Sequence, residues 1–422
     1  MADSRLPSCG GALEMSPAHA RTAWVLLSCV LTSPAFAQFE AEPYEVKPDR
    51  SVWLRALLDV RVVRAGPAPS WTDGGPGKTR YGGRSTDSGF ERATRTVLSE
   101  LALEVGASLP WSVRAQAQVN IQPDIADNYR PWLVEALLRK EWGRAENGLG
   151  LQTGVMTTPF SLEHVGPAWS PDFTLSASAL NSWLWEDISL AGAEGEWWRV
   201  TRSGWRLGAL VGAGYGTDQF GRLLALRGFA IGDGIGGING DLRLPARPDR
   251  TDIFNERDQR PAVYSWLTLG DTGDTASLKV GYFDNLGDEG ATGVWHTHFG
   301  TAGVTVHPLP RIDLLVQYLN GSAHVRAPPN DSSFHAFYAL LSYHYARQRI
   351  SIRYDSFAVH DLDGGPVSTG EHGDGVTAAY MLQFGLRHRV AFEHIWLNSR
   401  RPASGIENPT PDGWQLSYRF RY

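Results

Sequence analysis

Two histidines, His296 and His298, have the clearest spacing for chemistry in this chain of 422 residues. They flank a single residue in a stretch that reads as an extended strand, so both imidazoles fall on one face of it. Imidazole nitrogens are preferred ligands of zinc, but a zinc site needs further protein ligands. No third ligand is evident from the sequence. We therefore interpret the pair as ordinary polarity at the rim of a sheet and expect no metal.

Other short motifs give weaker signals. Two acidic clusters have the carboxylates that calcium prefers but not the usual loop spacing: Asp361 with Asp363, and Asp284 with Asp288 and Glu289. Segment 232–237 matches the spacing of a dinucleotide-binding glycine loop, yet no strand-turn-helix surrounds it, so we interpret it as a flexible loop. No grouping of serine, histidine and aspartate stands out, and we expect neither an enzyme nor a cofactor.

Charged residues have a more regular pattern, because they alternate with apolar residues along extended segments. In segment 52–62 an apolar row opposes Arg55, Asp59 and Arg61. The last nine residues alternate throughout, and their apolar members are Trp414, Leu416, Tyr418, Phe420 and Tyr422. Successive side chains of a strand point to opposite faces, so each segment has one apolar and one polar face. Consecutive strands of this kind are difficult to bury in a soluble core.

The closing strand resembles the last strand of Gram-negative outer-membrane porins, which ends on an aromatic residue that the assembly machinery reads. The chain also has a secretory signal and a regular alternation of strands and loops, both described below. Together with the closing strand, these features make the chain similar to the porin-like β-barrel superfamily. The resemblance implies a transmembrane antiparallel barrel with an apolar outer row, short periplasmic turns and long extracellular loops. The polar row then faces the lumen.

Alternation predicts an all-β fold of sixteen strands. The predicted strands lie near 52–63, 92–109, 111–121, 131–142, 149–157, 187–200, 204–216, 261–270, 275–284, 295–307, 311–320, 334–345, 348–357, 374–384, 386–398 and 413–422. Short turns alternate with longer connections, of which 64–91, 158–186 and 217–260 are the longest. An even number of strands closes the sheet without an exposed edge, so we predict a barrel over 52–422.

The first 37 residues have the composition of a signal peptide, with Arg21 before a short apolar run and a small-residue cleavage site at Ala35–Ala37. The start can be Met1 or Met15. Both cysteines lie inside this segment, so the mature chain has no cysteine chemistry. We expect residues 38–51 to be a periplasmic lead-in to the first strand.

The net charge of −6 argues against a nucleic-acid partner. The mature sequence has no apolar run approaching the ~20 residues of a spanning helix. Glycine and tryptophan are abundant, with 46 and 16 copies, which suits a membrane barrel whose hydropathy signal is weak in each strand.

Segment 222–231 is the most unusual part of the long connections, because it is mostly aliphatic and contains Arg222, Arg227 and Phe229. Water-exposed loops rarely carry so many aliphatic side chains. It can extend a strand above the membrane, or it can fold inward and narrow the lumen as a constriction loop. The sequence leaves both open. Segment 158–186, with three tryptophans, is a second candidate for inward folding or for subunit contact.

The polar row predicts the residues that line the pore. The candidates are Arg55, Asp59, Arg61, Arg114, Glu135, Arg139, Arg353, Asp355, Arg389, Glu393, Arg419 and Arg421. A sixteen-stranded barrel is wide enough for an aqueous channel unless a loop fills it. We therefore expect a solvent-exposed wall, with an arginine band below a carboxylate band.

The resemblance implies passive diffusion of small hydrophilic solutes across the cell outer membrane. Two alternatives stay open: an export channel for an anionic polysaccharide, and a barrel enzyme acting at the outer leaflet. The expected partners are outer-membrane lipid and lipopolysaccharide, the barrel assembly machinery, small hydrophilic solutes and a homotrimer of the chain.

Overall fold

The computed structural model describes residues 52–87, 89–123, 129–244, 250–326, 329–363, 370–401 and 413–422. The predicted signal peptide and the lead-in over 38–51 lie outside these residues. Among the described helices, none combines the length and the apolar character that crossing a membrane requires.

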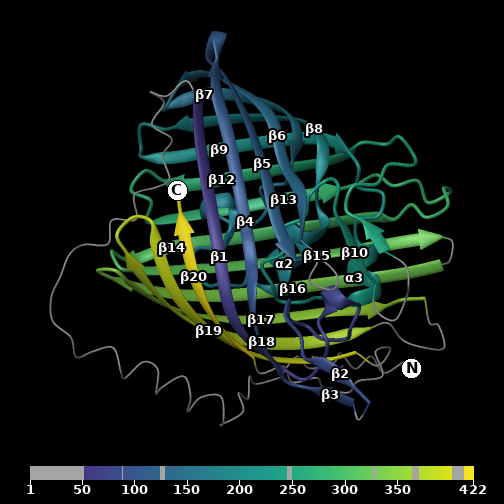
Figure 1. Cartoon of the computed structure of the whole chain (residues 1–422). Coiled ribbons are helices and arrows are strands. Elements are labelled where there is room, and N and C mark those ends of the chain that lie inside the picture. The colour runs from purple at the N-terminus through teal and green to yellow at the C-terminus, as the bar shows by residue number, and fades with distance from the viewer. Residues whose placement is uncertain are drawn as a thin grey trace, which may run out of the picture. The chain divides into compact units, whose positions relative to one another are not determined.

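The described residues form a closed antiparallel barrel of sixteen strands (Figure 1). The strands are β1 (Val52–Ala65), β4 (Ala93–Leu109), β5 (Val113–Pro123), β6 (Tyr129–Arg144), β7 (Asn147–Met156), β8 (Leu190–Val200), β9 (Trp205–Tyr215), β12 (Ala262–Asp271), β13 (Ala276–Asp284), β14 (His296–Leu309), β15 (Ile312–Arg326), β16 (Pro329–Tyr345), β17 (Gln348–Asp361), β18 (Glu371–Phe384), β19 (His388–Arg400) and β20 (Gly413–Arg421). Each pairs with the next, and β1 pairs with β20 to close the ring. The predicted all-β barrel and all sixteen strands are confirmed, with ends that differ by a few residues.

The closing strand has the two faces that its alternation predicts. Leu416, Tyr418 and Tyr422 are exposed on the outside, while Ser417 and Arg419 are buried inside. Arg419 lies directly opposite Asp59 of β1, which fixes the register at the point of closure. A shift of one residue would exchange the two faces of β20, so the pattern and the pairing support each other.

Strand β6 departs from simple alternation. Gln118 of β5 pairs with Glu135, but the next residue pairs with Leu133, so Val134 is an extra residue. A bulge of this kind lets neighbouring side chains point to the same side of the sheet. Trp132 and Val134 are therefore buried inside the barrel together with Glu135, whereas simple alternation along the strand would place both on the face opposite Glu135.

The two rims of the barrel differ in the length of their connections. At one rim the turns are short, as at Pro110–Ser112, a single 3-10 turn. The other rim has three long connections, 66–92, 157–189 and 216–261, which together we call the plug. The regular elements of the plug are η1 (Trp71–Asp73), β2 (Arg84–Thr86), β3 (Gly89–Glu91), η4 (Pro167–Trp169), α2 (Ala179–Asp187), α3 (Arg222–Arg227), β10 (Asp241–Arg243) and β11 (Arg250–Asp252).

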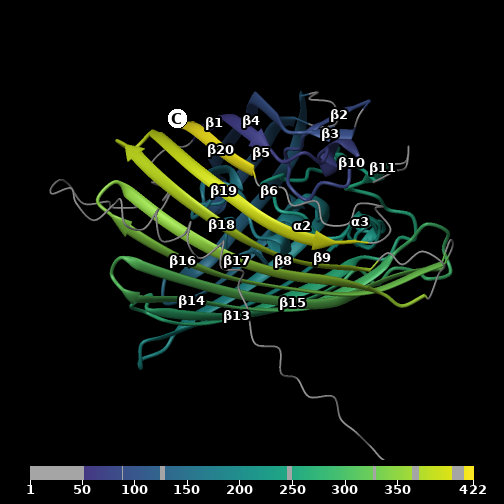
Figure 2. The ribbon, with the colours of Figure 1, turned by 90° about the horizontal axis from the view of Figure 1, so that it is seen from below.

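Much of the described part of the plug folds into the barrel, although the short hairpin of β2 and β3 stays exposed. Figure 2 shows α2 and α3 between opposing walls of strands. Every residue of α2 is buried, starting with an N-cap at which Ser178 accepts the Asn181 backbone N–H. An amphipathic surface helix would show one polar, exposed face, so a wholly buried helix needs partners on all sides. The barrel supplies them.

Candidate functional site in the barrel lumen

Aromatic side chains join the plug to the wall formed by β12–β16. The indole of Trp183 in α2 stacks on Phe220 with ring centroids 4.8 Å apart, and packs edge-on against Phe334 of β16 at 5.0 Å. Phe160 contacts Phe299 of β14 at 5.2 Å. All five rings are fully or almost fully buried. Contacts of this kind add to the free energy gained by removing apolar area from water, so this side of the lumen is a dry core.

Charged side chains join the plug to the opposite wall. Arg353 of β17 donates hydrogen bonds to the backbone oxygens of Ser176 and Ala177, at 2.6 and 2.9 Å. Glu393 of β19 accepts the Ser176 N–H at 3.1 Å, and Asp355 accepts the Ala179 N–H at 3.0 Å. One wall therefore satisfies both the carbonyl and the amide groups of the same plug segment. Backbone groups buried without partners would destabilise the fold, so these charges position the segment.

A second ionic cluster lies where β1 and β20 close the barrel. Asp59 pairs with Arg61 and with Arg419, each at 2.8 Å. Arg61 also reaches Asp233 of the plug at 2.6 Å, and Arg80 pairs with the other oxygen of Asp233 at 2.8 Å. Burial alone would raise the pKa of Asp233, but the two guanidinium groups hold it below its usual range. The cluster thus keeps Asp233 ionised and ties two plug connections to the wall.

Segment 232–237, which contains Asp233, is packed and hydrogen-bonded, so its interpretation as a flexible loop is wrong. A Cβ at Gly236 would lie 2.5 Å from the Glu186 backbone oxygen, and one at Gly237 would lie 2.8 Å from that of Leu133. The glycines therefore permit close approach of backbones. This explains their spacing without any nucleotide.

A third ion pair links α2 to α3 inside the plug. Glu186 and Arg227 lie 2.8 Å apart and both are buried. Burial raises the pKa of Glu186 to about 7, because the loss of water outweighs the nearby guanidinium group. Burial likewise raises the pKa of Asp187 to about 6, against a hydrogen bond from the Gly221 N–H. Two carboxyl groups of α2 therefore titrate near neutral pH while the plug is docked.

The predicted pore-lining residues all lie on inward-facing positions of the strands, but at two different levels. Those packed under the plug are buried: Asp59, Arg61, Glu135, Arg353, Asp355, Arg389, Glu393 and Arg419. Those toward the short-turn rim are half-buried or exposed: Arg55, Arg139 and Arg421 are half-buried, and Arg114 is exposed. The expectation of a solvent-exposed row is therefore wrong at the level of the plug. Whether these residues line a conducting path stays a prediction.

The candidate constriction loop takes the inward of its two predicted positions. Phe229 is fully buried against Trp183 and Phe357, and its N–H donates to Glu371 of β18 at 2.8 Å. The Arg227 guanidinium lies over the Trp71 ring at 4.4 Å. Arg222 is half-buried at the start of α3. The second candidate, 158–186, also lies inside, where Gln317 of β15 donates to the Phe160 oxygen at 2.7 Å.

Several residues that hold the plug were not predicted from the sequence. Glu163 pairs with Arg353 at 3.0 Å and accepts from the Asn181 side chain at 2.7 Å. Lys78 pairs with Glu371 and donates to the Arg227 oxygen. The only available signal was a few charges and amides inside apolar, aromatic loops. Such loops have no periodicity from which the direction of a side chain follows.

No family model and no curated protein matches the chain. Several solved structures match the chain. An anion-selective porin from Comamonas acidovorans matches with a TM-score of 0.53 at 11% identity, over 88% of this chain and 99% of that one. The outer membrane channel DcaP of Acinetobacter baumannii and Salmonella typhi OmpF each match with a TM-score of 0.54 at 11% identity, over 88% of this chain and 97% of theirs. At this identity the likeness establishes a porin-like sixteen-stranded barrel, as the sequence predicts, and nothing finer.

Proposed function

We propose that this chain is a channel of the Gram-negative outer membrane for small hydrophilic solutes, and that its plug gates the passage. The single observation that carries the proposal is a closed porin-like barrel whose inward charges hold a folded plug. A closed barrel with an apolar outer row suits lipid, because each of its strands pairs with a neighbour on both sides and no edge of unpaired backbone groups faces the lipid. We place the short turns in the periplasm and the long connections outside the cell.

The passage that we propose runs along the wall of β1, β17, β19 and β20. Three arginines gather toward its short-turn end: Arg389, Arg419 and Arg421. Arg389 lies opposite Arg419 across β19 and β20, and the carboxylate nearest to it is Asp172 at 3.6 Å. Charges of one sign in a narrow, low-dielectric passage attract counter-ions. The proposal therefore favours entry of anionic or neutral solutes over cations at this end.

The proposal treats the protein as a transporter without catalytic activity, embedded in lipid and lipopolysaccharide after insertion by the barrel assembly machinery. It also includes a homotrimer. Support for the trimer comes from OmpT of Vibrio cholerae, whose structure is described in a trimer form and matches with a TM-score of 0.50 at 10% identity. Cross-linking in native membranes would test it.

The test of the channel is conductance of the purified barrel in a planar bilayer, for the wild type and for a deletion of residues 222–231. We expect the deletion to raise single-channel conductance, because it removes a segment that fills the lumen. Trp111→Ala is the control, since Trp111 is 84% exposed at a short turn. Heat-modifiable gel mobility would show that each variant forms a barrel.

Two outcomes would contradict the proposal. If neither protein conducts although both are folded, the channel is rejected, and hydrolase assays on lipid and peptide substrates would then test the barrel enzyme. If both conduct equally, the protein is a channel but segment 222–231 does not obstruct it. Liposome swelling with neutral sugars and with an anionic oligosaccharide would separate diffusion of small solutes from polysaccharide export.

A further inference from the structure

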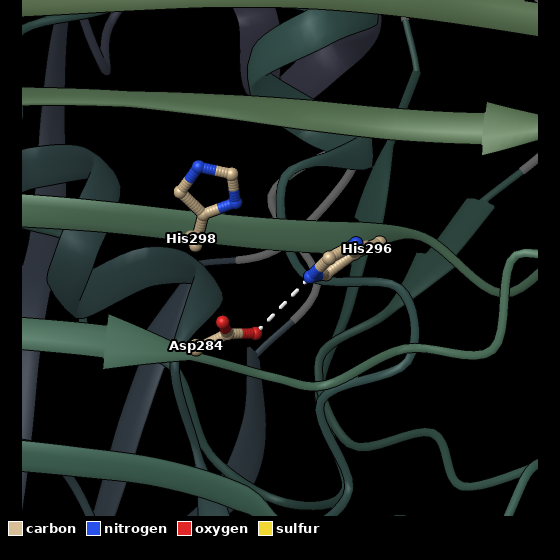
Figure 3. Close-up of side chains that lie close together, drawn as sticks. All are labelled: Asp284, His296 and His298. Carbon is tan, nitrogen blue, oxygen red and sulfur yellow. Dashed lines mark hydrogen bonds and ion pairs between the residues drawn. The ribbon is translucent and has the colours of Figure 1, made fainter.

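The structure brings a third ligand to the pair His296 and His298. These histidines begin β14, and Asp284 at the end of β13 lies directly opposite His298 in the pairing of the two strands. Thr297 and Phe299, between and beyond the histidines, are buried inside, so both imidazoles belong to the outer face of the barrel. Figure 3 shows Asp284 and His296 turned toward each other across the gap between the strands.

We propose that Asp284, His296 and His298 bind a divalent transition-metal ion of the zinc class. One ligand atom from each residue lies within 4.8 Å of the others. The His296 Nε2 and Asp284 Oδ1 atoms are 3.2 Å apart, which is a spacing that two ligands of one ion can have. Two imidazoles and one carboxylate leave coordination positions open for water or an outside ligand, as in catalytic and exchangeable metal sites.

Other side chains hold each proposed ligand in place. The Tyr282 hydroxyl donates to Asp284 Oδ2 at 3.1 Å, while the Leu286 N–H donates to Oδ1 at 2.8 Å. His298 Nε2 lies 3.3 Å from the Ser322 hydroxyl. His296 Nδ1 lies 3.1 Å from Glu289 Oε1. Ligating histidines commonly place their second ring nitrogen against a carboxylate, which fixes the orientation of the ring.

Charge also favours a cation here. Asp284 and Glu289 lie on either side of the His296 ring, so two carboxylates share one imidazole. An ion with two positive charges would neutralise both carboxylates, whereas a protonated imidazole neutralises one. The mixed nitrogen and oxygen donors select zinc, copper or nickel over magnesium and calcium, which prefer oxygen alone.

Each donor is half-buried near the long-loop rim, so an ion from solution can reach it. The site is separate from the lumen, because all three ligands point outward while the plug packs against the inward face of the same strands. Its test therefore does not depend on whether the barrel conducts. This separation distinguishes failure of the metal site from failure of the proposed channel.

The experiment is titration of the full barrel in detergent with Zn²⁺ by calorimetry, and with Co²⁺ by visible absorption, which reports coordination. We expect saturable binding of one ion to each chain. His298→Ala and Asp284→Asn should each weaken binding at least about tenfold, and Glu289→Gln should weaken it less, since that residue orients a ligand. His394→Gln is the matched control, because His394 lies on the outer face of β19 and stacks on Trp396.

A second control distinguishes this site from other histidines on the outer face. The ring centroids of His335 and His360 lie 5.5 Å apart, and those of His360 and His372 lie 5.4 Å apart, so the three rings form a row across β16–β18. If His335→Gln abolishes binding while His298→Ala does not, the ion binds there and the proposal is wrong. The proposal is also wrong if the wild type shows no saturable binding, or if Co²⁺ gives the same spectrum in the wild type and in the two ligand variants, His298→Ala and Asp284→Asn.

Discussion

The same plug is attached to two walls of the barrel by opposite chemistry. On β12–β16 the contacts are aromatic and aliphatic, as between Trp183 and Phe334. On β1 and β17–β20 most of the named contacts are ion pairs and charged hydrogen bonds, as between Arg353 and the backbone of Ser176, although Phe229 also packs on Phe357 of β17. Apolar packing is non-directional and excludes water. Buried charges instead cost desolvation, and their attraction offsets this cost only while every partner is in place.

This difference indicates how the plug can move. Separating the aromatic wall from the plug would expose a large apolar area to water, which is strongly unfavourable. Separating the charged wall would expose groups that water can solvate well, so part of the lost attraction returns as hydration. We therefore expect the aromatic wall to act as the fixed attachment and the charged wall as the side that opens.

The largest expected effect is a loss of stability when the aromatic attachment of the plug is weakened. Trp183→Ala removes a buried indole that contacts Phe220 and Phe334, so it should lower the free energy of unfolding by about 3–5 kcal/mol. Urea unfolding of the purified barrel in detergent would measure it, with Trp111→Ala as the exposed control. Equal stability of the two variants would mean that the aromatic contacts do not hold the plug.

The next effect tests whether the charged wall is sealed. Ser417 is buried and donates to Asp59 at 2.7 Å, so Ser417→Asp would place a second carboxylate beside the first. We expect Ser417→Asp to impair assembly about as strongly as Phe420→Asp, whose charge would face lipid at a cost of up to a few kcal/mol. A lumen open to water at this level would tolerate Ser417→Asp.

Outer-membrane levels and heat-modifiable mobility would compare these variants. Ser277→Asp is the matched control, because Ser277 lies on the inward face of β13 near the short-turn rim and is only half-buried. If Ser417→Asp behaves like Ser277→Asp, the charged wall is hydrated and the comparison between the two walls fails.

A third prediction concerns ion selectivity. Neutralising the three wall carboxylates together, as Asp59→Asn, Asp355→Asn and Glu393→Gln, removes three negative charges from the wall. Arg419 then loses the carboxylate of Asp59, whereas Arg61 keeps Asp233 and Arg353 keeps Glu163. The reversal potential across a salt gradient should shift toward anions. The shift should shrink with salt, because the Debye length falls from about 10 Å at 0.1 M to about 3 Å at 1 M.

Its control is a neutralisation at a short turn, Asp271→Asn with Asp274→Asn, because neither carboxylate contacts a predicted pore-lining residue and Asp274 is exposed. An unchanged reversal potential in a folded wall variant would mean that conduction does not pass the charged wall.

The smallest expected effect is a dependence of conductance on pH. Burial raises the pKa of Glu186 to about 7 and that of Asp187 to about 6, above the values of the undocked groups. A raised pKa in the docked state contributes stability that is present at acidic pH and lost as the pH rises through about 6–7. Conductance should therefore increase as the pH rises through this range, and Glu186→Gln should flatten the profile. An increase toward acidic pH would have the wrong sign.

The amino-acid sequence by itself determined the strands and their faces. Alternation is a local property with a period of two residues, so Arg55, Asp59 and Arg61 had to share a face wherever β1 lies. The aromatic row of β20 and the short turns at one rim follow in the same way. A closed barrel then follows because an antiparallel sheet with one apolar and one charged face has few other ways to satisfy its edges.

Only the tertiary structure decided what the inward face contacts. Glu163 and Asp233 lie in loops without periodicity, and their partners Arg353 and Arg61 are more than a hundred residues away in the chain. Val134 entered the lumen through a bulge that alternation cannot foresee. Asp284 met His298 because the register of β13 on β14 places them opposite. Contacts between distant segments depend on how the chain closes on itself, and no local pattern encodes that closure.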